Sequence, residues 1–469
     1  MFTESGFTVI AGAGPTGLTL ARQLGRHGVP YRIVERSPRP FDGSRGKGLQ
    51  PRTLEVLDDL GLISRFLDAG GEYPALRAHL PGGGTHDFRL DEPREATPAV
   101  PYPNMLMVPQ WRTSALLAEG VPVEFGVGLT GLTPTDDGVR VTLDTGETVD
   151  ARYVVGADGG GSTVRKLLGI GFEGETHEEE RMLIADVRLR GLDRGHWHVW
   201  PSGERSFRLG LCPLPGTDWF QLTAPPSTMS AAELVASVDP SITVTEVGWT
   251  SEFRANIRMA SRFRAGDVFL AGDAAHVHPP AGGQGLNTGI QDAYNLGWKI
   301  ATGNSAVLDT YEEERLPVAA SVLGVSSHLH RRHVEGAEDA MRRDDPVLRQ
   351  LSLNYRGAAL ARDHRPRPGL VQAGDRAPDA PLSAGRAGDV PLSAGRVFDL
   401  LRGAHATLLA FHWSETLPEL PVPVHHVSEA ASAYDVTGPA LFLIRPDNYI
   451  GCVTHEPADV LDYLKQITP

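Results

Sequence analysis

The sequence predicts an α/β protein of three units: a parallel-sheet domain, a mainly β domain inserted into it, and a small C-terminal α/β domain. Three observations indicate this class. The pattern of strand, glycine-rich turn and helix occurs three times, starting near residues 7, 152 and 267. Alternating strand segments rich in aromatic residues fill residues 180–262, between the second and third pattern. Near residue 364 the composition becomes rich in Pro, Gly and Arg, as in a linker or docking segment.

Composition limits the function classes. A chain of 469 residues should hold two or three domains, since single cores stop growing near ~250–300 residues. The net charge of −14 argues against nucleic acid or an anionic membrane as the main partner. Cys212 and Cys452 form neither a CxxC pair nor a zinc-type spacing. With no apolar run of membrane-spanning length and no room for a signal peptide before the first strand, we expect a cytoplasmic protein.

The first glycine motif, "GAGPTG", follows the strand "FTVIA" and opens the helix "LTLARQLGRHG". Gly12 allows a tight turn, Gly14 lets a pyrophosphate approach the backbone, and Gly17 lets helix and strand pack closely. Glu35 ends the next strand, where it can bind ribose hydroxyls. The motif therefore predicts a Rossmann-like dinucleotide-binding domain, but it does not distinguish NAD from FAD.

The second and third motifs favour FAD. "GADGGGSTVR" places Asp158 directly after a strand, and "GDAAHVHPPAGGQGLNTG" places Asp273 after another. An elongated dinucleotide needs anchors along its length, and a carboxylate at a strand end suits the ribityl hydroxyls. The glycines of the third motif admit a planar ring. A helix predicted to start near Thr288 would direct its positive end at that ring and stabilise a reduced flavin.

The histidines of the third motif raise a metal alternative. His276 and His278 stand two residues apart, as two metal ligands on one strand could. No third ligand with suitable spacing accompanies them, so we expect no metal and assign both histidines to the support of the flavin loop.

These three motifs, in this order, resemble the class A FAD-dependent aromatic monooxygenases, the para-hydroxybenzoate hydroxylase-like family. Within that family, "SRGKGLQPRTLEVLDDLGL" and the C-terminal tail resemble the polyketide and antibiotic hydroxylases of actinomycetes. The resemblance is strong over residues 7–320 and looser over the tail. It implies an FAD-binding domain, an inserted substrate-binding domain and a thioredoxin-like tail. The expected ranges are 1–71, 104–178 and 266–365 for FAD, 72–103 and 179–265 for substrate, and 372–469 for the tail.

The resemblance also assigns site residues. Arg45 and Pro280 are the expected catalytic residues, and Trp200 and Phe207 are the aromatic residues that we choose for the substrate wall. The expected FAD contacts are Gly12, Gly14, Pro15, Thr16, Gly17, Glu35, Arg36, Arg45, Gln110, Asp158, Asp273, Pro280, Gly283, Gly285, Leu286 and Asn287. The segment after Arg112 is shorter than in similar enzymes, which predicts no more than a half-turn of helix there.

The implied activity is hydroxylation of an aromatic polyketide or related phenolic antibiotic. NADPH or NADH would reduce the flavin, and O₂ would form a C4a-hydroperoxyflavin whose distal oxygen passes to the substrate. Baeyer–Villiger insertion or antibiotic inactivation on the same scaffold stays open, as does a non-enzymatic flavin-binding scaffold. In the tail, residues 412–415 read His-Trp-Ser-Glu where a working thioredoxin needs CxxC. We therefore expect a redox-inactive tail with a packing or oligomer role, which allows a homodimer.

Overall fold

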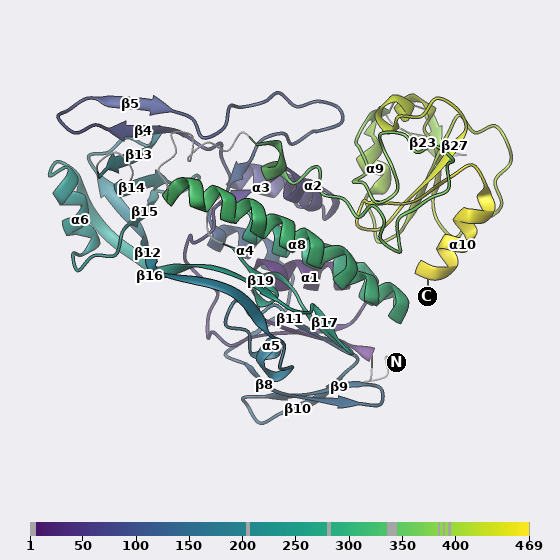
Figure 1. The fold of residues 1–469 in the computed structure, drawn as a ribbon, viewed down its shortest axis with the longest axis horizontal. Helices are drawn as coiled ribbons and strands as arrows, with labels where there is room; N and C mark the ends of the chain where they lie inside the picture. Colours follow the sequence, from purple (N-terminus) through teal and green to yellow (C-terminus); the bar gives the residue numbers. More distant parts are fainter. Residues whose placement is uncertain are drawn as a thin grey trace.

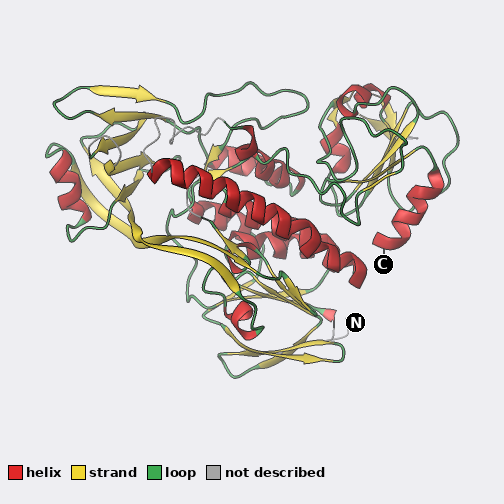
Figure 2. Cartoon of the chain, viewed as in Figure 1, coloured by secondary structure: helices red, strands yellow, loops and turns green. Residues whose placement is uncertain are grey.

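The computed structural model describes residues 6–202, 207–278, 283–334, 345–382, 385–387, 390–392 and 395–468. Figure 1 shows three parts: a central α/β body, a β-rich part on one side and a small C-terminal part on the other. The helices and strands in Figure 2 show the same division, with the longest strands running from the central body into the β-rich part. The predicted α/β class and its three units are confirmed.

The central sheet has six strands in the order β17-β18-β11-β1-β2-β7. Neighbouring strands from β18 to β7 pair in parallel, and β17 joins the edge in the antiparallel direction. Strand β1 is buried along its whole length, as expected of a parallel strand covered on both faces. The strand bounds are β1 Thr8–Ala11, β2 Tyr31–Glu35, β7 Val123–Phe125, β11 Tyr153–Gly156, β17 Arg264–Ala265 and β18 Val268–Leu270.

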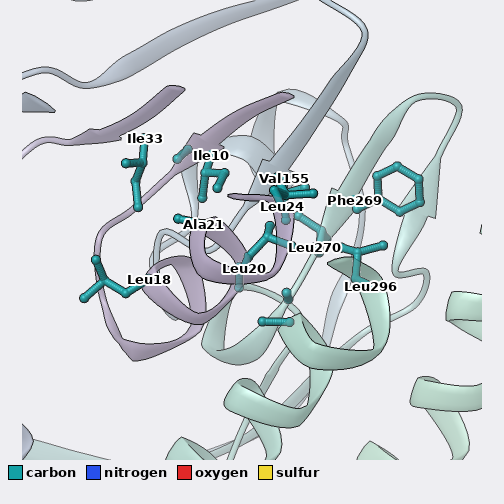
Figure 3. Packing of buried hydrophobic residues seen from close by; sticks show 14 of the residues in the cluster. Ile10, Leu18, Leu20, Ala21, Leu24, Ile33, Val155, Phe269, Leu270 and Leu296 are labelled. Atoms are coloured by element: carbon teal, nitrogen blue, oxygen red, sulfur yellow. The ribbon is translucent and has the colours of Figure 1, made fainter. Parts of the chain in front are cut away.

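Helices pack on this sheet through one continuous apolar core. Helix α1 (Pro15–Arg26) packs along α7 (Gly285–Thr302), and Figure 3 shows side chains such as Leu20, Leu24 and Leu296 meeting between them and the sheet. Helix α7 starts three residues before the predicted Thr288. Helix α8 follows it and crosses the front of the molecule in Figure 1. The other helices of this part are α2 Pro51–Asp59, α3 Ile63–Ala69, α4 Gln110–Ala118, α5 Thr163–Leu167 and α8 Ser305–Val334.

One expectation for this region was wrong. The short segment after Arg112 does not form a half-turn stub, because α4 already starts at Gln110 and continues for nine residues. Its buried residues, Leu116 and Leu117 among them, join the core of the central body. The predicted hairpin turn at Thr145-Gly146 is present in a three-stranded sheet of β8 Leu129–Thr135, β9 Gly138–Leu143 and β10 Thr148–Ala151.

The inserted part is an eight-stranded sheet in the order β19-β16-β12-β15-β14-β13-β4-β5. Two strands of it are long and carry the chain out of the central body and back. The expected boundary at 178/179 falls inside one of them, β12, so the two domains share a continuous strand. The bounds are β4 Ala75–His79, β5 Thr85–Phe88, β12 Phe172–Arg190, β13 His196–Pro201, β14 Phe207–Pro213, β15 Trp219–Ala224, β16 Thr243–Ala260 and β19 His276–Val277.

The two faces of the inserted sheet differ sharply. The outer face carries Val187, Leu209 and Leu222, which pack under helix α6 (Ala231–Val238) in a small apolar core. Because side chains alternate along a strand, Asp186 and Gln221 point to the opposite face. We call this opposite side the inner face, since it contacts residues 44–47 of the central body. A two-stranded pair, β3 Gly48–Leu49 and β6 Leu106–Met107, follows that contact.

The C-terminal part has a five-stranded mixed sheet in the order β20-β28-β27-β25-β26. Residues 364–382 are more than a linker, because Ala373, Ala377 and Leu382 are buried in its core. Cys452 lies here and Cys212 lies in β14; both are buried and unpaired, and burial raises the pKa of each thiol. The bounds are β20 Arg362–Asp363, β21 Pro381–Leu382, β22 Gly385–Ala387, β23 Val390–Leu392, β24 Gly395–Arg396, α9 Val397–Leu401, β25 Thr407–Phe411, β26 Val424–His426, β27 Ala440–Ile444, β28 Ile450–Thr454 and α10 Pro457–Ile467.

No helix among the described residues is long and apolar enough to cross a membrane.

Candidate active site

The three glycine motifs meet at one edge of the central sheet. Strands β18, β11 and β1 are consecutive and parallel, and each motif follows the carboxyl end of one of them. In an open α/β sheet, ligands bind at this edge, where the chain turns from strand into helix. The fold therefore brings together three motifs that are more than a hundred residues apart in the sequence.

The first turn has the geometry that its glycines predict. A Cβ atom on Gly12 would lie 2.4 Å from the carbonyl oxygen of Ala157 in the second motif, and one on Gly17 would lie 2.0 Å from the carbonyl oxygen of Gly12. A Cβ on Gly14 would meet no atom within 4 Å. Gly12 and Gly17 thus allow close packing, whereas Gly14 leaves open space at the start of α1, where a phosphate can approach the backbone.

Glu35 lies at the end of β2 and faces this turn. Its carboxylate accepts hydrogen bonds from the backbone N–H groups of Ala13 (2.9 Å) and Ser37 (2.8 Å), which fix the side chain beside the turn. Pro15 is the first residue of α1, and Arg36 is exposed next to Glu35. Thr16 points to the third motif, because Cβ atoms on Gly272 and Gly289 would lie only 2.5 Å and 2.4 Å from its hydroxyl oxygen.

Asp158 builds the second turn. It accepts hydrogen bonds from the Ser162 hydroxyl (2.5 Å) and from the backbone N–H of Thr163 (2.6 Å), which caps the start of α5. Gly160 and Gly161, between these residues, leave their surface accessible: Cβ atoms there would meet one side-chain carbon at 3.2 Å and nothing within 4 Å, respectively. Asp158 therefore shapes a turn whose outer side is open.

Asp273 marks a hollow in the third motif. It lies in a short 3-10 turn (Gly272–Ala274) whose other two residues are buried, yet its own side chain is exposed. Surrounding protein atoms remove enough water to raise the pKa of Asp273, while the charges of His276 and Arg45 oppose the shift. An exposed carboxylate deep among protein atoms indicates an open recess beside it, in the place where a ribityl chain would lie.

The two histidines form a chain that ends at this recess. His276 is fully buried and contacts Asp292 (2.6 Å) through Nε2 and His278 (3.0 Å) through Nδ1. Burial alone would raise the pKa of Asp292, but His276 and Arg315 hold it well below its usual range. Burial and the neighbouring His276 lower the pKa of His278. Among the described residues, no group of three or more His, Cys, Asp or Glu side chains is placed to hold a metal ion.

His278 leaves one atom unsatisfied. Its Nδ1 is buried and has no hydrogen-bond partner in the described structure. The ring lies at the start of α7, where a Cβ on Gly285 would be 3.4 Å from the His278 Cδ2 atom and 4.0 Å from an Asp273 carboxylate oxygen. A buried donor or acceptor without a partner costs free energy, so this atom is suited to a ligand in the recess.

Asn287 ties the recess together through its side chain. The amide oxygen accepts from the Gln50 N–H (2.7 Å), and the amide nitrogen donates to the carbonyls of Gly48 (2.9 Å) and Gly283 (2.8 Å). These bonds occupy the amide group, so only the backbone of Asn287 is left for a cofactor contact. Sequence reasoning named the residue but did not find this role.

Gln110 and Leu286 close the recess on the side of the inserted domain. Gln110 accepts a hydrogen bond from the N–H of Gly46 (2.9 Å), and a Cβ on Gly46 would lie 3.2 Å from Leu286. Next to Gly46, Arg45 is exposed and lies 5.9 Å from the ring centres of both Phe41 and Trp249. The predicted residues Gln110 and Leu286 thus lie next to Gly46 on one wall of the recess, and Arg45 lies at the edge of that wall.

Three predicted residues need separate comment. Pro280 and the side chain of Phe207 lie outside the described part of the structure. Trp200 is buried on the outer face of the inserted sheet, stacked on His79 at a ring distance of 4.3 Å and packed under α6. These are the contacts of a core residue. Trp197 of the same strand faces the central body instead, and its ring lies 4.3 Å from the Lys47 ammonium.

The residues present fit FAD. The open turn at Gly14, the Glu35 carboxylate, the exposed Asp273 and the unpaired His278 Nδ1 follow the sheet edge in the order that an extended dinucleotide needs. The positive ends of α1 and α7 both point into this region. Opposite them lies the inner face of the inserted sheet, so a substrate can be held between that face and the flavin.

Comparison with known families defines the class. The FAD binding domain family matches residues 7–326, more than half of the chain. The chain belongs to this family and is an FAD-dependent monooxygenase.

Individual monooxygenases of the family are similar to this chain. It is 45% identical to a flavin-dependent monooxygenase of Mycobacteroides abscessus, over 98% of the chain and 99% of that protein. It is 38% identical to a rifampicin monooxygenase of Streptomyces venezuelae, over 71% of the chain and 73% of that protein. A 12-dehydrotetracycline 5-monooxygenase/anhydrotetracycline 6-monooxygenase of Streptomyces rimosus is 35% identical, over 97% and 96%.

Solved structures agree along the whole chain. The rebeccamycin biosynthetic enzyme RebC with reduced flavin superposes with a TM-score of 0.81 at 27% identity, covering 99% of each chain. The anhydrotetracycline hydroxylase OxyS from Streptomyces rimosus superposes with a TM-score of 0.72 at 31% identity, covering 98% of this chain and 99% of that one. The C-terminal part is therefore shared with both.

Proposed function

We propose that this monooxygenase hydroxylates an aromatic polyketide or a related phenolic antibiotic, with NADPH or NADH as the reductant. The observation that carries the proposal is the meeting of the three glycine motifs at one edge of the central sheet, with the Asp273 side chain exposed there. The names of the relatives that act on tetracycline and rifampicin compounds support the substrate class. Bound FAD would supply the activation of O₂.

The chain's own residues hold and shield the reacting groups. Glu35 and the N-terminal end of α1 would bind the adenosine side and the pyrophosphate, and Asp273 would bind the ribityl hydroxyls. The backbone of Gly285 and Leu286 would face the flavin ring at the positive end of α7, which favours negative charge there. Gln110, bonded to Gly46, fixes the wall between ring and substrate. The inserted sheet covers the site and excludes water.

The division of the chain follows the same logic. We propose that residues 1–71, 104–178 and 266–365 bind FAD, that 72–103 and 179–265 bind substrate, and that 372–469 dock on the FAD-binding part. Two buried, unpaired cysteines support a reducing compartment, so we place the enzyme in the cytoplasm.

The test measures NADPH and NADH oxidation by the FAD-loaded protein with a panel of hydroxylated aromatic polyketides. We expect oxidation to accelerate with a phenolic substrate, and the product to gain one oxygen atom with its ring skeleton intact by NMR. Ring expansion or ring opening would instead favour Baeyer–Villiger insertion or antibiotic inactivation. A protein that takes up no FAD would contradict the proposal.

A pair of variants ties the activity to the recess. Asp273→Asn should weaken FAD binding about 10- to 100-fold, because a charge-assisted contact to the ribityl chain is lost. Asp462→Asn is the matched control, since this carboxylate is exposed on α10 and pairs only with Lys465. FAD affinity is measured by fluorescence titration of the deflavinated protein. Equal affinities of the two variants would remove Asp273 from the site.

A further inference from the structure

The inner face of the inserted sheet carries a polar cluster that the cofactor does not explain. Asp186 of β12 accepts a hydrogen bond from the Ser44 hydroxyl, and Gln221 of β15 bonds to the same hydroxyl at 3.1 Å. Lys47 donates to the amide oxygen of Gln221, and its ammonium lies 4.3 Å from the Trp197 ring centre. Side chains from several strands thus converge on the segment that follows Arg45.

Lys47 has no carboxylate of its own. Within the described ranges, no Asp or Glu lies within ion-pair distance of its amine, and the nearby Asp186 is bonded to Ser44. By contrast, the buried Lys299 pairs with Glu314 at 2.7 Å. Burial lowers the pKa of Lys47, although the Cys212 thiol and Asp186 partly oppose the shift. A partly buried amine without a carboxylate partner is stabilised when an anion is brought next to it.

A second unpaired group adjoins Lys47. The indole Nε1 of Trp197 is buried without a hydrogen-bond partner in the described structure. It lies next to Gly210, where a Cβ would be 3.4 Å from that nitrogen and 2.7 Å from the Thr223 hydroxyl. A side chain at position 210 would therefore not fit here, and the Trp197 N–H is an unpaired donor near Lys47.

A surface pocket lies near this cluster. It has a volume of about 650 Å³ and is lined by residues 213–218, Arg194, Glu72, Pro74 and Met107. The Met107 sulfur lies 3.8 Å from the Cys212 sulfur, and Cys212 is the thiol beside Lys47. On its other side, Lys47 follows Gly46, which contacts Gln110 and Leu286 of the flavin wall. Lys47 is therefore linked to the pocket wall through Cys212 and Met107, and to the flavin wall through Gly46.

We propose that Lys47 binds the ionised hydroxyl of the substrate, so that the enzyme selects acidic phenols and enols over their ethers. The inference rests on the proposed function and names its substrate class. On binding, the O–H bond of the substrate breaks, its electron pair stays on oxygen, and the proton passes to solvent water. The phenolate then pairs with the Lys47 ammonium, beside the unpaired Trp197 N–H. The negative oxygen makes the ring more electron-rich and more reactive toward an electrophilic oxygen donor.

The test is an equilibrium titration of the FAD-loaded enzyme without any nicotinamide nucleotide. The probes are 4-nitrophenol and 4-nitroanisole, which differ in the acidic hydroxyl. The wild-type protein should bind the phenol at least about tenfold more tightly than the ether. At a pH one unit below the probe's own pKa, the bound phenol should absorb as the anion.

Lys47→Met should weaken phenol binding about 10- to 100-fold, leave the ether unchanged, and make the bound phenol absorb as the neutral form. Lys465→Met is the matched control, because that lysine is exposed and pairs only with Asp462. FAD content and thermal unfolding show whether each variant is folded. If Lys47→Met does not fold, the absorbance spectrum of 4-nitrophenol bound to the wild-type protein still shows whether the enzyme binds the anion.

Equal affinity of the wild-type protein for the two probes, or a neutral spectrum of the bound phenol, would overturn the inference. So would a Lys47→Met variant that loses both probes equally. These outcomes differ from failure of the proposed function, which shows in turnover: no oxygenated aromatic product forms. An enzyme that hydroxylates phenols without any of the Lys47 effects would retain the function and lose this inference.

Discussion

At the interface with the C-terminal part, Glu314 contacts Lys299 at 2.7 Å and Arg445 at 2.6 Å, and Arg445 also pairs with Asp447. On the inner face of the inserted sheet, Lys47 contacts a neutral amide and an aromatic ring. All four interface side chains are fully buried, and every charge there has an opposite partner. The contrast concerns charge: in the described ranges, the Lys47 amine has no carboxylate within ion-pair distance, whereas every charge of the interface network has one.

The difference separates groups that hold the fold from groups that await a ligand. A buried charge with full partners fixes how two parts dock, and losing one partner exposes the others to an apolar surrounding. The interface also reaches the site: Arg376 pairs with Glu55 of α2, and α2 follows Gln50, whose N–H bonds to Asn287. Docking of the C-terminal part thus steadies the wall of the recess without contributing a residue to it.

The largest effect on stability is expected when a charge is removed from the buried network at the interface with the C-terminal part. Glu314→Gln leaves Lys299 and Arg445 with one carboxylate, Asp447, and should lower the free energy of unfolding by about 3–5 kcal/mol. Urea unfolding followed by fluorescence measures the change. Asp462→Asn, at an exposed pair with Lys465, should cost less than about 1 kcal/mol. Similar losses for both variants would show that the buried network is not a main source of stability.

The next largest effect is expected on the inner face of the inserted sheet, where Asp186 should make the stability of the protein depend on pH. Burial raises the pKa of Asp186 to about 6 from an ordinary 3.8, although the Ser44 hydrogen bonds oppose the shift. The folded state therefore holds this proton more tightly than the unfolded state. The resulting stability is full below pH 4 and is lost as pH rises through 6, by about 2–3 kcal/mol at most.

The variant Asp186→Asn cannot titrate and should lack this loss. Its stability relative to the wild-type protein should improve between pH 4 and pH 7, as measured by urea unfolding with saturating FAD at each pH. Parallel stability curves for the two proteins would mean that Asp186 is ionised in the folded state throughout this range.

Local chemistry explains what the sequence could predict. The three turns were found because each needs glycines and a carboxylate at fixed places beside a strand end, and Gly12, Gly17 and Asp158 take part in such turns. The start of α7 was missed by only three residues, since Gly285 gives little sign of a helix start. Family resemblance supplied Gln110, and the structure shows it bonded to Gly46.

Long-range packing explains what the sequence missed. Strand alternation already places Trp197 and Trp200 on opposite faces of β13, but which face meets the central body depends on α6, which covers the other. The partners of Lys47 are likewise more than a hundred residues away, so "SRGKG" alone indicated only a glycine-rich loop. A lysine between glycines and next to a predicted site residue was the available signal.

The smallest effect concerns the unpaired atom in the recess. His278→Phe removes the buried Nδ1 and also the Nε2 contact to His276, so the unfolding free energy of the FAD-free protein should fall by about 1–2 kcal/mol. FAD affinity should fall about five- to tenfold, because the cofactor loses the hydrogen bond for which Nδ1 is free. Fluorescence titration and urea unfolding measure the two quantities on the same preparation. A variant that is strongly destabilised but binds FAD normally would show that His278 stabilises the fold, as Glu314 does. Of the groups assigned to ligand binding, Lys47 would then be left without this objection.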